Sequence, residues 1–451
     1  MLRSVSIATF FMLILACGTT TKNKQTVYVK PEVISDSALL DLVQKQTIKY
    51  FTEGAEPVSG MGRERFHTDE DYPEHDKNII TSGGSGFGVM SLIVAMKRKF
   101  ISKEEGLQRL EKIVQFLETA DRFHGAWPHW WNGETGKVKP FGKKDNGADL
   151  VETSYMLQGL LCVRQYFKDG NEKEKALAQR IDKLWKAVGF DWFRNGKNVL
   201  SWHWSPEYKW QMNFPVRGYN ECLIMYILAA ASPTHSVPAE VYHEGWADSG
   251  KIRSPHTALG YKLELRYQGN PPNGAPLFWS QYSYLGLDPR ELKDRYTDYW
   301  KENTNQTLIN YTWCVNNPKK YKGYGENNWG LTASYSVKFY AAHAPDSIND
   351  RGVITPTAAL SSFPYTPKES MAALKHWYFD MNDKLWGPYG FYDAFSETEN
   401  WYPVKYLAID QGPIPVMIEN YRTGLLWNLF MSCPEIRNGL KKLGFTSPAI
   451  K

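Results

Sequence analysis

Apolar residues recur along this chain with the period of an α-helix, and they do so in two alternating ways. Some segments, such as 84–96 and 149–163, are apolar nearly all round and begin with small or polar residues. The segments between them, such as 103–118 and 172–186, carry their charges on one face. All-round apolar helices are buried, whereas amphipathic helices cover a surface. The alternation therefore predicts helical hairpins, each with one inner and one outer helix.

The predicted helices are spread along the whole chain after residue 36. We expect them at 37–53, 84–99, 103–120, 148–168, 171–190, 218–231, 278–286, 290–314, 330–342, 367–380 and 412–432. The inner helices begin near residues 84, 148, 218, 278, 330 and 410. Six such hairpins close into an all-α fold, an (α/α)6 barrel, here with small β-hairpins near 199–204 and 262–266 and with loop insertions. The inner N-termini then meet at one end, so that polar residues at the helix starts face a shared cleft.

The first 35 residues differ from this pattern. Arg3 precedes an apolar run at 7–16, which is too short to span a membrane and is typical of a signal peptide. The run ends at Cys17 in a sequence that resembles a bacterial lipobox; an ordinary cleavable signal with a chance cysteine is the alternative. We expect a signal peptide at 1–16, a lipidated Cys17 with a flexible tether at 17–35, and a single catalytic domain at 36–451. The expected location is the bacterial cell envelope, on its periplasmic side or its outer surface.

Composition narrows the class of partner. The formal net charge is only +5, and the lysines are spread along the chain without a basic stripe, which argues against nucleic acid. A nearly neutral protein suits a neutral substrate. The four cysteines after Cys17 lie in apolar stretches and contain no Cys-x-x-Cys pair, so we expect buried free thiols. We expect the protein to be a monomer.

Four carboxylates stand at the starts of predicted inner helices. Asp149 and Glu152 are three residues apart and share a helical face, although both suit a first turn as capping residues. Glu221 opens another buried helix, where an apolar surround raises a carboxyl pKa as a general acid requires. Asp410 precedes Gly412-Pro413 and has the position of an N-cap, yet such a cap can also be an exposed base.

Aromatic side chains form a second set of candidates. The chain has 17 Trp and 27 Tyr, many of them in loops rich in Gly, Asn and Pro. Flat aromatic faces pack against the C–H faces of pyranose rings, and Asn, Gln and His bind hydroxyls; core packing is the competing explanation. The predicted sugar contacts are Trp127, His129, Trp130, Trp202, His203, Trp204, Asn220, Trp279, Tyr282, Trp329, Tyr389, Phe391, Trp401 and Gln411.

Several common chemistries have no motif in this sequence. His-Glu-x-x-His, Gly-x-Ser-x-Gly and the phosphate-binding Gly-Lys-Ser/Thr are all missing. The glycines of 83–88 do not have the dinucleotide-binding spacing, and we interpret them as a close approach of backbone in the cleft. The acidic loop 69–76 lacks the spacing of an EF-hand. We therefore expect neither a metal nor a cofactor.

Longer stretches carry a resemblance to a known family. They include Asp-Leu-Val-Glu-Thr-Ser at 149–154, Ser-Trp-His-Trp-Ser-Pro at 201–206, Gly-Tyr-Asn-Glu at 218–221, Trp-Gly-Leu-Thr-Ala-Ser at 329–334, Pro-Thr-Ala-Ala-Leu at 356–360 and Asp-Gln-Gly-Pro at 410–413. Over about 38–446 the chain resembles the glycoamylase-like bacterial glycoside hydrolases, which include the endo-β-1,2-glucanases.

The resemblance implies an (α/α)6 barrel and anomer-inverting hydrolysis. It points to Glu221 as the acid and Asp410 as the base, with Asp149 and Glu152 as further acidic residues of the cleft. The expected reaction is hydrolysis of β-1,2-glucan to sophorose or sophoro-oligosaccharides. The alternatives are hydrolysis of another glucan, including an α-linked one, a glycan-binding lipoprotein without turnover, and a polysaccharide lyase.

Overall fold

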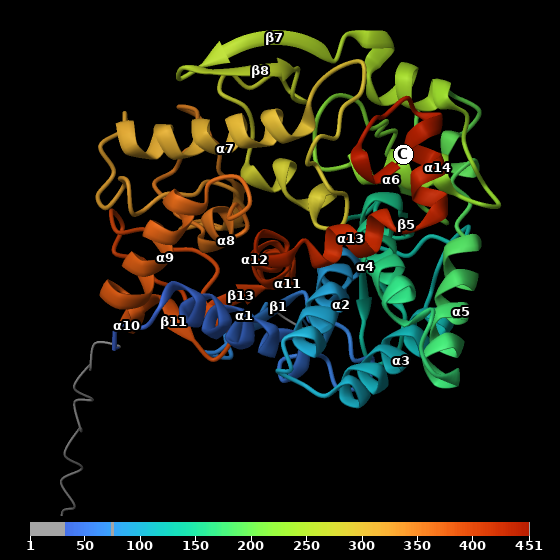
Figure 1. The fold of residues 1–451 in the computed structure, drawn as a ribbon, viewed down its shortest axis with the longest axis horizontal. Helices are drawn as coiled ribbons and strands as arrows, with labels where there is room; N and C mark the ends of the chain where they lie inside the picture. Colours follow the sequence, from blue (N-terminus) through green and yellow to red (C-terminus); the bar gives the residue numbers. More distant parts are fainter. Residues whose placement is uncertain (1–31, 74–75, 451) are drawn as a thin grey trace, which may run out of the picture.

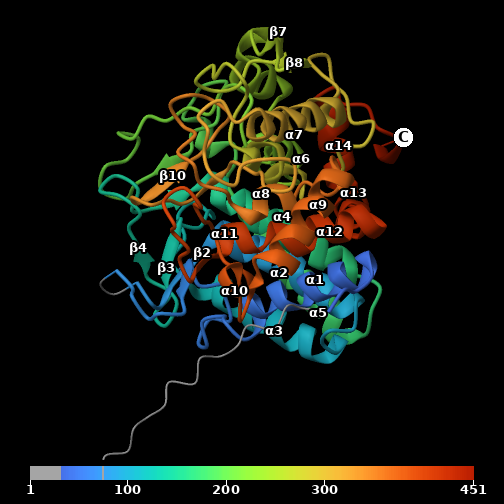
Figure 2. The ribbon, with the colours of Figure 1, turned by 90° about the vertical axis from the view of Figure 1, so that its left-hand side faces the viewer.

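The computed structural model describes residues 32–73 and 76–450. The predicted signal peptide and lipidated Cys17 lie outside these residues. Helix α12 (Pro413–Thr423) is seen nearly end-on near the centre of Figure 1, with the other helices arranged about it in this view. Viewed from the side in Figure 2, the helices lie at the right, and β2, β3, β4 and β10 gather at the left. Among the described helices, none is both long enough and apolar enough to span a membrane.

Six inner elements close a ring. They are α2 (Ser82–Lys97), α4 (Leu150–Phe167), α6 (Leu223–Ala231), the 3-10 turns η4 (Leu277–Ser280) and η5 (Tyr282–Tyr284), α8 (Pro356–Leu360), and α11 (Ala408–Gln411) continued by α12 (Pro413–Thr423). Helix α2 packs against α4, α4 against α6, α6 against η5, α12 against α8, and α12 back against α2. The side chain of Gln281 bridges the remaining gap by donating to the Ala358 carbonyl at 3.0 Å. The predicted (α/α)6 barrel is confirmed.

The outer elements alternate with the inner ones along the chain. They are α1 (Asp36–Thr52), α3 (Lys103–Thr119), α5 (Glu172–Lys186), the π-helical turn η2 (Val241–Trp246), α7 (Tyr299–Asn316) and α9 (Pro367–Asp380), with the short α10 (Asn382–Leu385) after α9. Helices α13 (Leu425–Met431) and α14 (Pro434–Lys442) end the chain. Polar caps begin several of them: Ser102 accepts a hydrogen bond from the Glu105 amide, and Asn171 forms a capping box with Glu174.

Strands are short and antiparallel. They pair as β1 (Arg65–His67) with β13 (Lys405–Leu407), β5 (Ala148–Asp149) with β6 (His203–Trp204), β7 (Arg253–Ala258) with β8 (Tyr261–Leu265), β9 (Ala333–Tyr335) with β10 (Tyr340–Ala342), and β11 (Trp386–Gly387) with β12 (Gly390–Phe391). A three-stranded sheet joins β2 (Ile79–Thr81), β3 (Trp130–Asn132) and β4 (Val138–Lys139). The predicted hairpin near 262–266 is confirmed by β8, and strand β6 lies within the other predicted hairpin, at 199–204.

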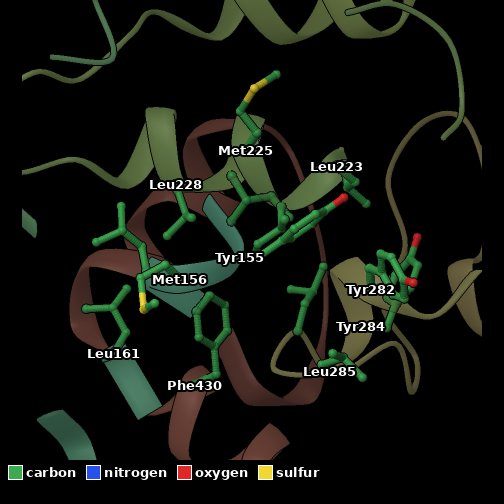
Figure 3. Close-up of a cluster of buried hydrophobic side chains, with 14 of the residues drawn as sticks. Tyr155, Met156, Leu161, Leu223, Met225, Leu228, Tyr282, Tyr284, Leu285 and Phe430 are labelled. Carbon is green, nitrogen blue, oxygen red and sulfur yellow. The ribbon is translucent and has the colours of Figure 1, made fainter. Parts of the chain in front are cut away.

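The barrel is held by an apolar core between the inner helices and the C-terminal segment. Figure 3 shows Met156 and Leu161 of α4, Leu223 and Leu228 of α6, and Phe430 of α13 meeting in one cluster. The glycines of α2 allow two inner helices to approach closely: a Cβ on Gly86 would lie 2.4 Å from the Tyr155 carbonyl oxygen. The close approach of backbone predicted at 83–88 is confirmed, but at Gly86 it lies between α2 and α4 in the core rather than in the cleft. The four cysteines of the described residues are buried and free, as expected.

Some helix predictions were wrong. Residues 330–342, predicted as an inner helix, form strands β9 and β10, and the fifth inner element is the short α8. Residues 278–286 form two 3-10 turns rather than an α-helix. Helix α7 begins only at Tyr299, where Asp298 caps it, so that 290–298 are irregular. Helix α6 begins at Leu223 because Gly218 has a positive φ of 78° and Asn220 turns its side chain back to the Cys222 amide.

Candidate active site

A cleft opens where the predicted inner-helix starts meet. Its volume is about 630 Å³, and it is lined mainly by acidic and aromatic side chains. A second cavity of about 460 Å³ shares Trp202, Glu221 and Phe278 with the first. Glu221 therefore lines both cavities and lies where they meet. A chain-like ligand that crosses from one cavity to the other would pass over its carboxyl group.

Glu221 has the properties of a proton donor. It is 8% exposed and precedes α6. Burial raises the pKa of its carboxyl to about 7, and the negative charges of Glu152 and Asp149 act in the same direction. Its Oε2 atom has no hydrogen-bond partner among the described residues, so no protein group competes for that atom. A carboxylic acid that keeps its proton near pH 7 can protonate a leaving oxygen.

A network of histidines and carboxylates lies beside Glu221. Asp149 caps α4 by accepting the Glu152 amide at 2.9 Å, and its Oδ2 accepts from Trp202 Nε1 at 3.1 Å. The same Oδ2 lies 3.0 Å from His129 Nδ1. Burial lowers the pKa of His129, but the charge of Glu152 and the bond to Asp149 outweigh it and raise this pKa to about 9. Asp149 is therefore both a helix cap and part of the site.

Glu152 extends this network to the cleft. Burial raises its pKa to about 7 although His129 opposes the shift. Its Oε2 accepts a hydrogen bond from the Gly83 amide at 2.7 Å, and a Cβ on Gly83 would lie 2.4 Å from the same oxygen. Glycine at this position thus lets the carboxyl reach the backbone of α2. Glu152 faces the cleft with Glu221, and Asp149 lies behind it, fully buried.

Three residues of the same network have the spacing of metal ligands. Ligand atoms of His129, Asp145 and Asp149 lie within 4.8 Å of one another. His203 Nε2 lies 3.3 Å from Asp145 Oδ2. These groups already pair with each other as histidine–carboxylate contacts, which need no metal to balance their charges.

Asp410 lies under the cleft rather than on its wall. It is 1% exposed, and Tyr282, which lines the cleft, donates its hydroxyl to Oδ1 at 3.5 Å. Burial and the neighbouring Asp393 raise the pKa of Asp410 well above its ordinary range. The N-cap interpretation of Asp410 was wrong, because the chain is already helical from Ala408 and no side chain caps α11 or α12.

The structure brings part of the predicted sugar-binding set into the cleft. His129, Trp130, Trp202 and Tyr282 line the first cavity, and Trp279 lines the second. His203 contacts Asp145 behind the cleft. Trp204 packs against Phe123 and His124.

Other members of that set lie elsewhere. Trp127, Trp329 and Phe391 have no exposed surface and belong to the core, which corrects their prediction as sugar contacts. The buried side chains of Asn220 and Gln411 are used in local hydrogen bonds, to Cys222 and to the Phe391 carbonyl. The remaining two, Tyr389 and Trp401, are not among the residues that line either cavity.

Sequence reasoning missed several cleft residues. The first cavity is also lined by Glu64, Arg65, Phe141, Tyr335, Phe339 and Tyr340. Arg65 forms an ion pair with Glu64 and lies 5.8 Å from the ring centre of Trp130. Phe141 lies in a loop between Pro140 and Gly142, a setting that could have marked it as an exposed aromatic. Phe339 and Tyr340 were hidden by the wrong helix prediction at 330–342.

Comparisons with known proteins show the family of this chain. A family model described as Glycoamylase matches residues 213–434. An endo-β-1,2-glucanase from Chitinophaga pinensis, solved in complex with sophorotriose and glucose, is 70% identical with a TM-score of 0.92, covering 92% of this chain and 100% of that chain. The chain belongs to the glycoamylase-like family of glycoside hydrolases.

More distant relatives extend the comparison. The exo β-1,2-glucooligosaccharide sophorohydrolase (non-reducing end) of Parabacteroides distasonis is 44% identical over 439 residues, which is 94% of this chain. This chain spans 60% of the length of that relative. An endo-β-1,2-glucanase from Talaromyces funiculosus, in complex with sophorose, is only 12% identical and has a TM-score of 0.64. The match covers 90% of this chain and 86% of that chain. That last likeness extends to the fold alone.

Proposed function

We propose that this member of the family is an inverting glycoside hydrolase that cleaves β-1,2-glucan to sophorose or sophoro-oligosaccharides. Glu221 protonates the leaving glycosidic oxygen, and Asp410 takes a proton from the attacking water. The observation that carries the proposal is the placement of Glu221, a buried carboxyl with a pKa of about 7, where two cavities meet. Inverting enzymes use two carboxyl groups on opposite sides of the scissile bond.

The relatives support the choice of linkage. The 70% identical glucanase was solved with sophorotriose, and the curated relative is a sophorohydrolase acting on β-1,2-glucooligosaccharides. One is named as an endo enzyme and the other as an exo enzyme. The two cavities that meet at Glu221 favour internal cleavage, because a chain can extend to both sides of the acid. A pure binding protein has no need of a buried carboxyl with an elevated pKa at the cleft.

Product analysis on a panel of glucans tests this function. Purified protein is incubated with β-1,2-, β-1,3-, β-1,4- and α-linked glucans, and the products are separated by chain length. We expect sophoro-oligosaccharides from β-1,2-glucan and no products from the others. Release of sugars from a different glucan, or from none, contradicts the proposal.

A matched pair of variants separates catalysis from folding. Glu221→Gln should lower turnover of β-1,2-glucan by about 10²–10⁴. Glu302→Gln is the control: Glu302 is buried and also has a pKa raised to about 7 by burial, but it accepts hydrogen bonds from the amides of Glu264 and Leu265 outside both cavities. The control should retain turnover in its folded fraction. Equal losses in both variants would indicate a general effect of removing buried carboxyls.

We further propose that the chain is anchored in the bacterial cell envelope through an acylated Cys17 and acts as a monomer. The support is the sequence alone: an apolar run ends at Cys17, and the polar segment 18–30 follows. Cys17→Ala should release active protein from membranes and abolish uptake of labelled fatty acid. Membrane-bound, labelled Cys17→Ala protein contradicts the anchor, and a concentration-independent dimer in sedimentation contradicts the monomer.

A further inference from the structure

A second buried aspartate, Asp393, lies within hydrogen-bonding reach of the Asp410 side chain. Asp393 follows strand β12 and, like Asp410, is 1% exposed. Hydrogen bonds hold the two segments together on either side of the pair. The Asp393 amide donates to the Lys405 carbonyl at 2.9 Å, and Gln411 Nε2 donates to the Phe391 carbonyl at 3.0 Å.

Each carboxyl has one oxygen engaged and one without a donor. Asp393 Oδ2 accepts the Tyr335 amide at 2.8 Å, and Asp410 Oδ1 accepts the Tyr282 hydroxyl. The other two oxygens, Asp393 Oδ1 and Asp410 Oδ2, are buried and receive no hydrogen bond from any N–H or hydroxyl group of the described residues. Buried acceptors without donors are rare in folded proteins and call for an explanation.

The groups around the pair do not neutralise it. Among the described residues, Asp393 and Asp410 form no ion pair with a Lys, Arg or His. The charged group that acts on both is Glu64, which is itself acidic and raises both pKa values. The remaining titratable neighbours are the hydroxyls of Tyr282, Tyr335 and Tyr340. Burial raises their pKa values, and the charge of Asp410 or Asp393 acts in the same direction.

Two adjacent buried carboxylates without a cation cannot both be charged, because like charges repel strongly at low dielectric. A single proton between them removes the repulsion and supplies the donor that the two orphaned oxygens lack. We propose that Asp393 is a positioning residue for Asp410: the two carboxyls share one proton, in a hydrogen bond between Asp393 Oδ1 and Asp410 Oδ2. The role of Asp393 in turnover rests on the proposed function.

This arrangement prepares Asp410 to act as a base. With one shared proton the pair carries a single negative charge, and Asp410 acts as the base when the proton is on Asp393. During hydrolysis the water O–H bond breaks and its proton passes to Asp410, while the water oxygen bonds to the anomeric carbon. The glycosidic C–O bond breaks as Glu221 gives its proton to the leaving oxygen. The pair then holds two protons; before the next turnover it returns one to solvent, and Glu221 takes one up from solvent.

An infrared titration without substrate tests the shared proton directly. In protein labelled with ¹³C at the aspartate carboxyls, we expect the band of a protonated aspartic acid to persist at pH 7. Asp393→Asn and Asp410→Asn should each abolish that band, because the new amide donates to the remaining carboxylate and takes the place of the shared proton. Asp350→Asn is the control and should keep the band, since Asp350 is equally buried but accepts from Trp313 and Tyr324 away from the cleft. A band that survives in either pair variant overturns the proposal.

Turnover on β-1,2-glucan tests the role of Asp393 in the reaction. The amide of Asp393→Asn can still donate to Asp410 and accept from Tyr335, so this variant should keep most of kcat/KM. Asp393→Ala removes the hydrogen-bond partner that stabilises the singly charged pair. The first proton is then harder to remove, so the acid limb of the pH profile should move upward by about one unit. A uniform loss at every pH, with an unmoved limb, would assign Asp393 a structural role only. If the infrared result holds but wild-type protein turns over no β-1,2-glucan, the proposed function fails while the shared proton stands.

Discussion

The pH dependence of hydrolysis should report the protonation of Glu221. Its pKa of about 7, against an ordinary value of 4.5, corresponds to about 3 kcal/mol against the charged form. About nine-tenths of the carboxyl is then protonated at pH 6 and about one-tenth at pH 8, whereas an unperturbed glutamate is about 3% protonated at pH 6. Because only the protonated form can act as the acid, kcat/KM should fall as pH rises, with a midpoint near 7.

The neighbouring carboxylate provides a way to move that midpoint. Glu152→Gln removes a negative charge that raises the pKa of Glu221, so the alkaline midpoint should shift to lower pH. The shift should stay below about one unit, because burial rather than Glu152 is the largest cause of the elevated pKa. The assay is the initial rate of reducing-end release from β-1,2-glucan at low substrate concentration between pH 4 and pH 10. A wild-type midpoint near 9 would follow His129 instead and refute the assignment, as would an upward shift in Glu152→Gln.

Three further changes probe the base, the cleft rim and the barrel. Asp410→Asn should nearly abolish hydrolysis without unfolding the protein, and full activity in this variant would remove Asp410 from the mechanism. Phe339→Ala should raise KM several-fold with an unchanged Tm, because Phe339 lines the cleft and is 88% exposed; Val33→Ala, at 87% exposure and outside the cleft, should change neither. Glu419→Leu should destabilise the fold by about 3–5 kcal/mol in chemical denaturation. Arg98 donates a hydrogen bond to Glu419 Oε2 at 2.7 Å, and the variant leaves this arginine without its buried partner. A loss below about 1 kcal/mol would show that Arg98 remains solvated.

Much of the barrel could be predicted because inner and outer helices differ in composition. Five of the six inner elements begin close to their predicted positions, since an all-round apolar segment has no stable place except the interior. The remaining inner element, α8, has only five residues, too few to show a helical period. The hairpin β9–β10 was mistaken for a helix because its apolar and polar residues do not alternate clearly. Its turn depends on Phe339 at a positive φ of 62°, which periodicity does not predict.

Some residues of the site could be predicted from the sequence and others could not. Glu221, Glu152 and Asp149 could be found because a carboxylate at the start of an apolar helix is costly unless it has a partner or a function. Asp393 could not, because it lies in an irregular segment after β12 and reaches Asp410 only through the tertiary fold. Of the predicted aromatic contacts, Trp130 lines the cleft whereas Trp127 is buried in the core, since sequence alone does not tell which side of a segment is covered.

The anomeric configuration of the first product tests the central claim most directly. Wild-type protein is mixed with β-1,2-glucan at high enzyme concentration, and the new reducing ends are followed by proton NMR before mutarotation. Inversion by Glu221 and Asp410 predicts that the α-anomer appears first and decays toward the equilibrium mixture. Initial appearance of the β-anomer would mean a retaining mechanism, in which a carboxylate attacks the anomeric carbon and Asp410 is not the base for water.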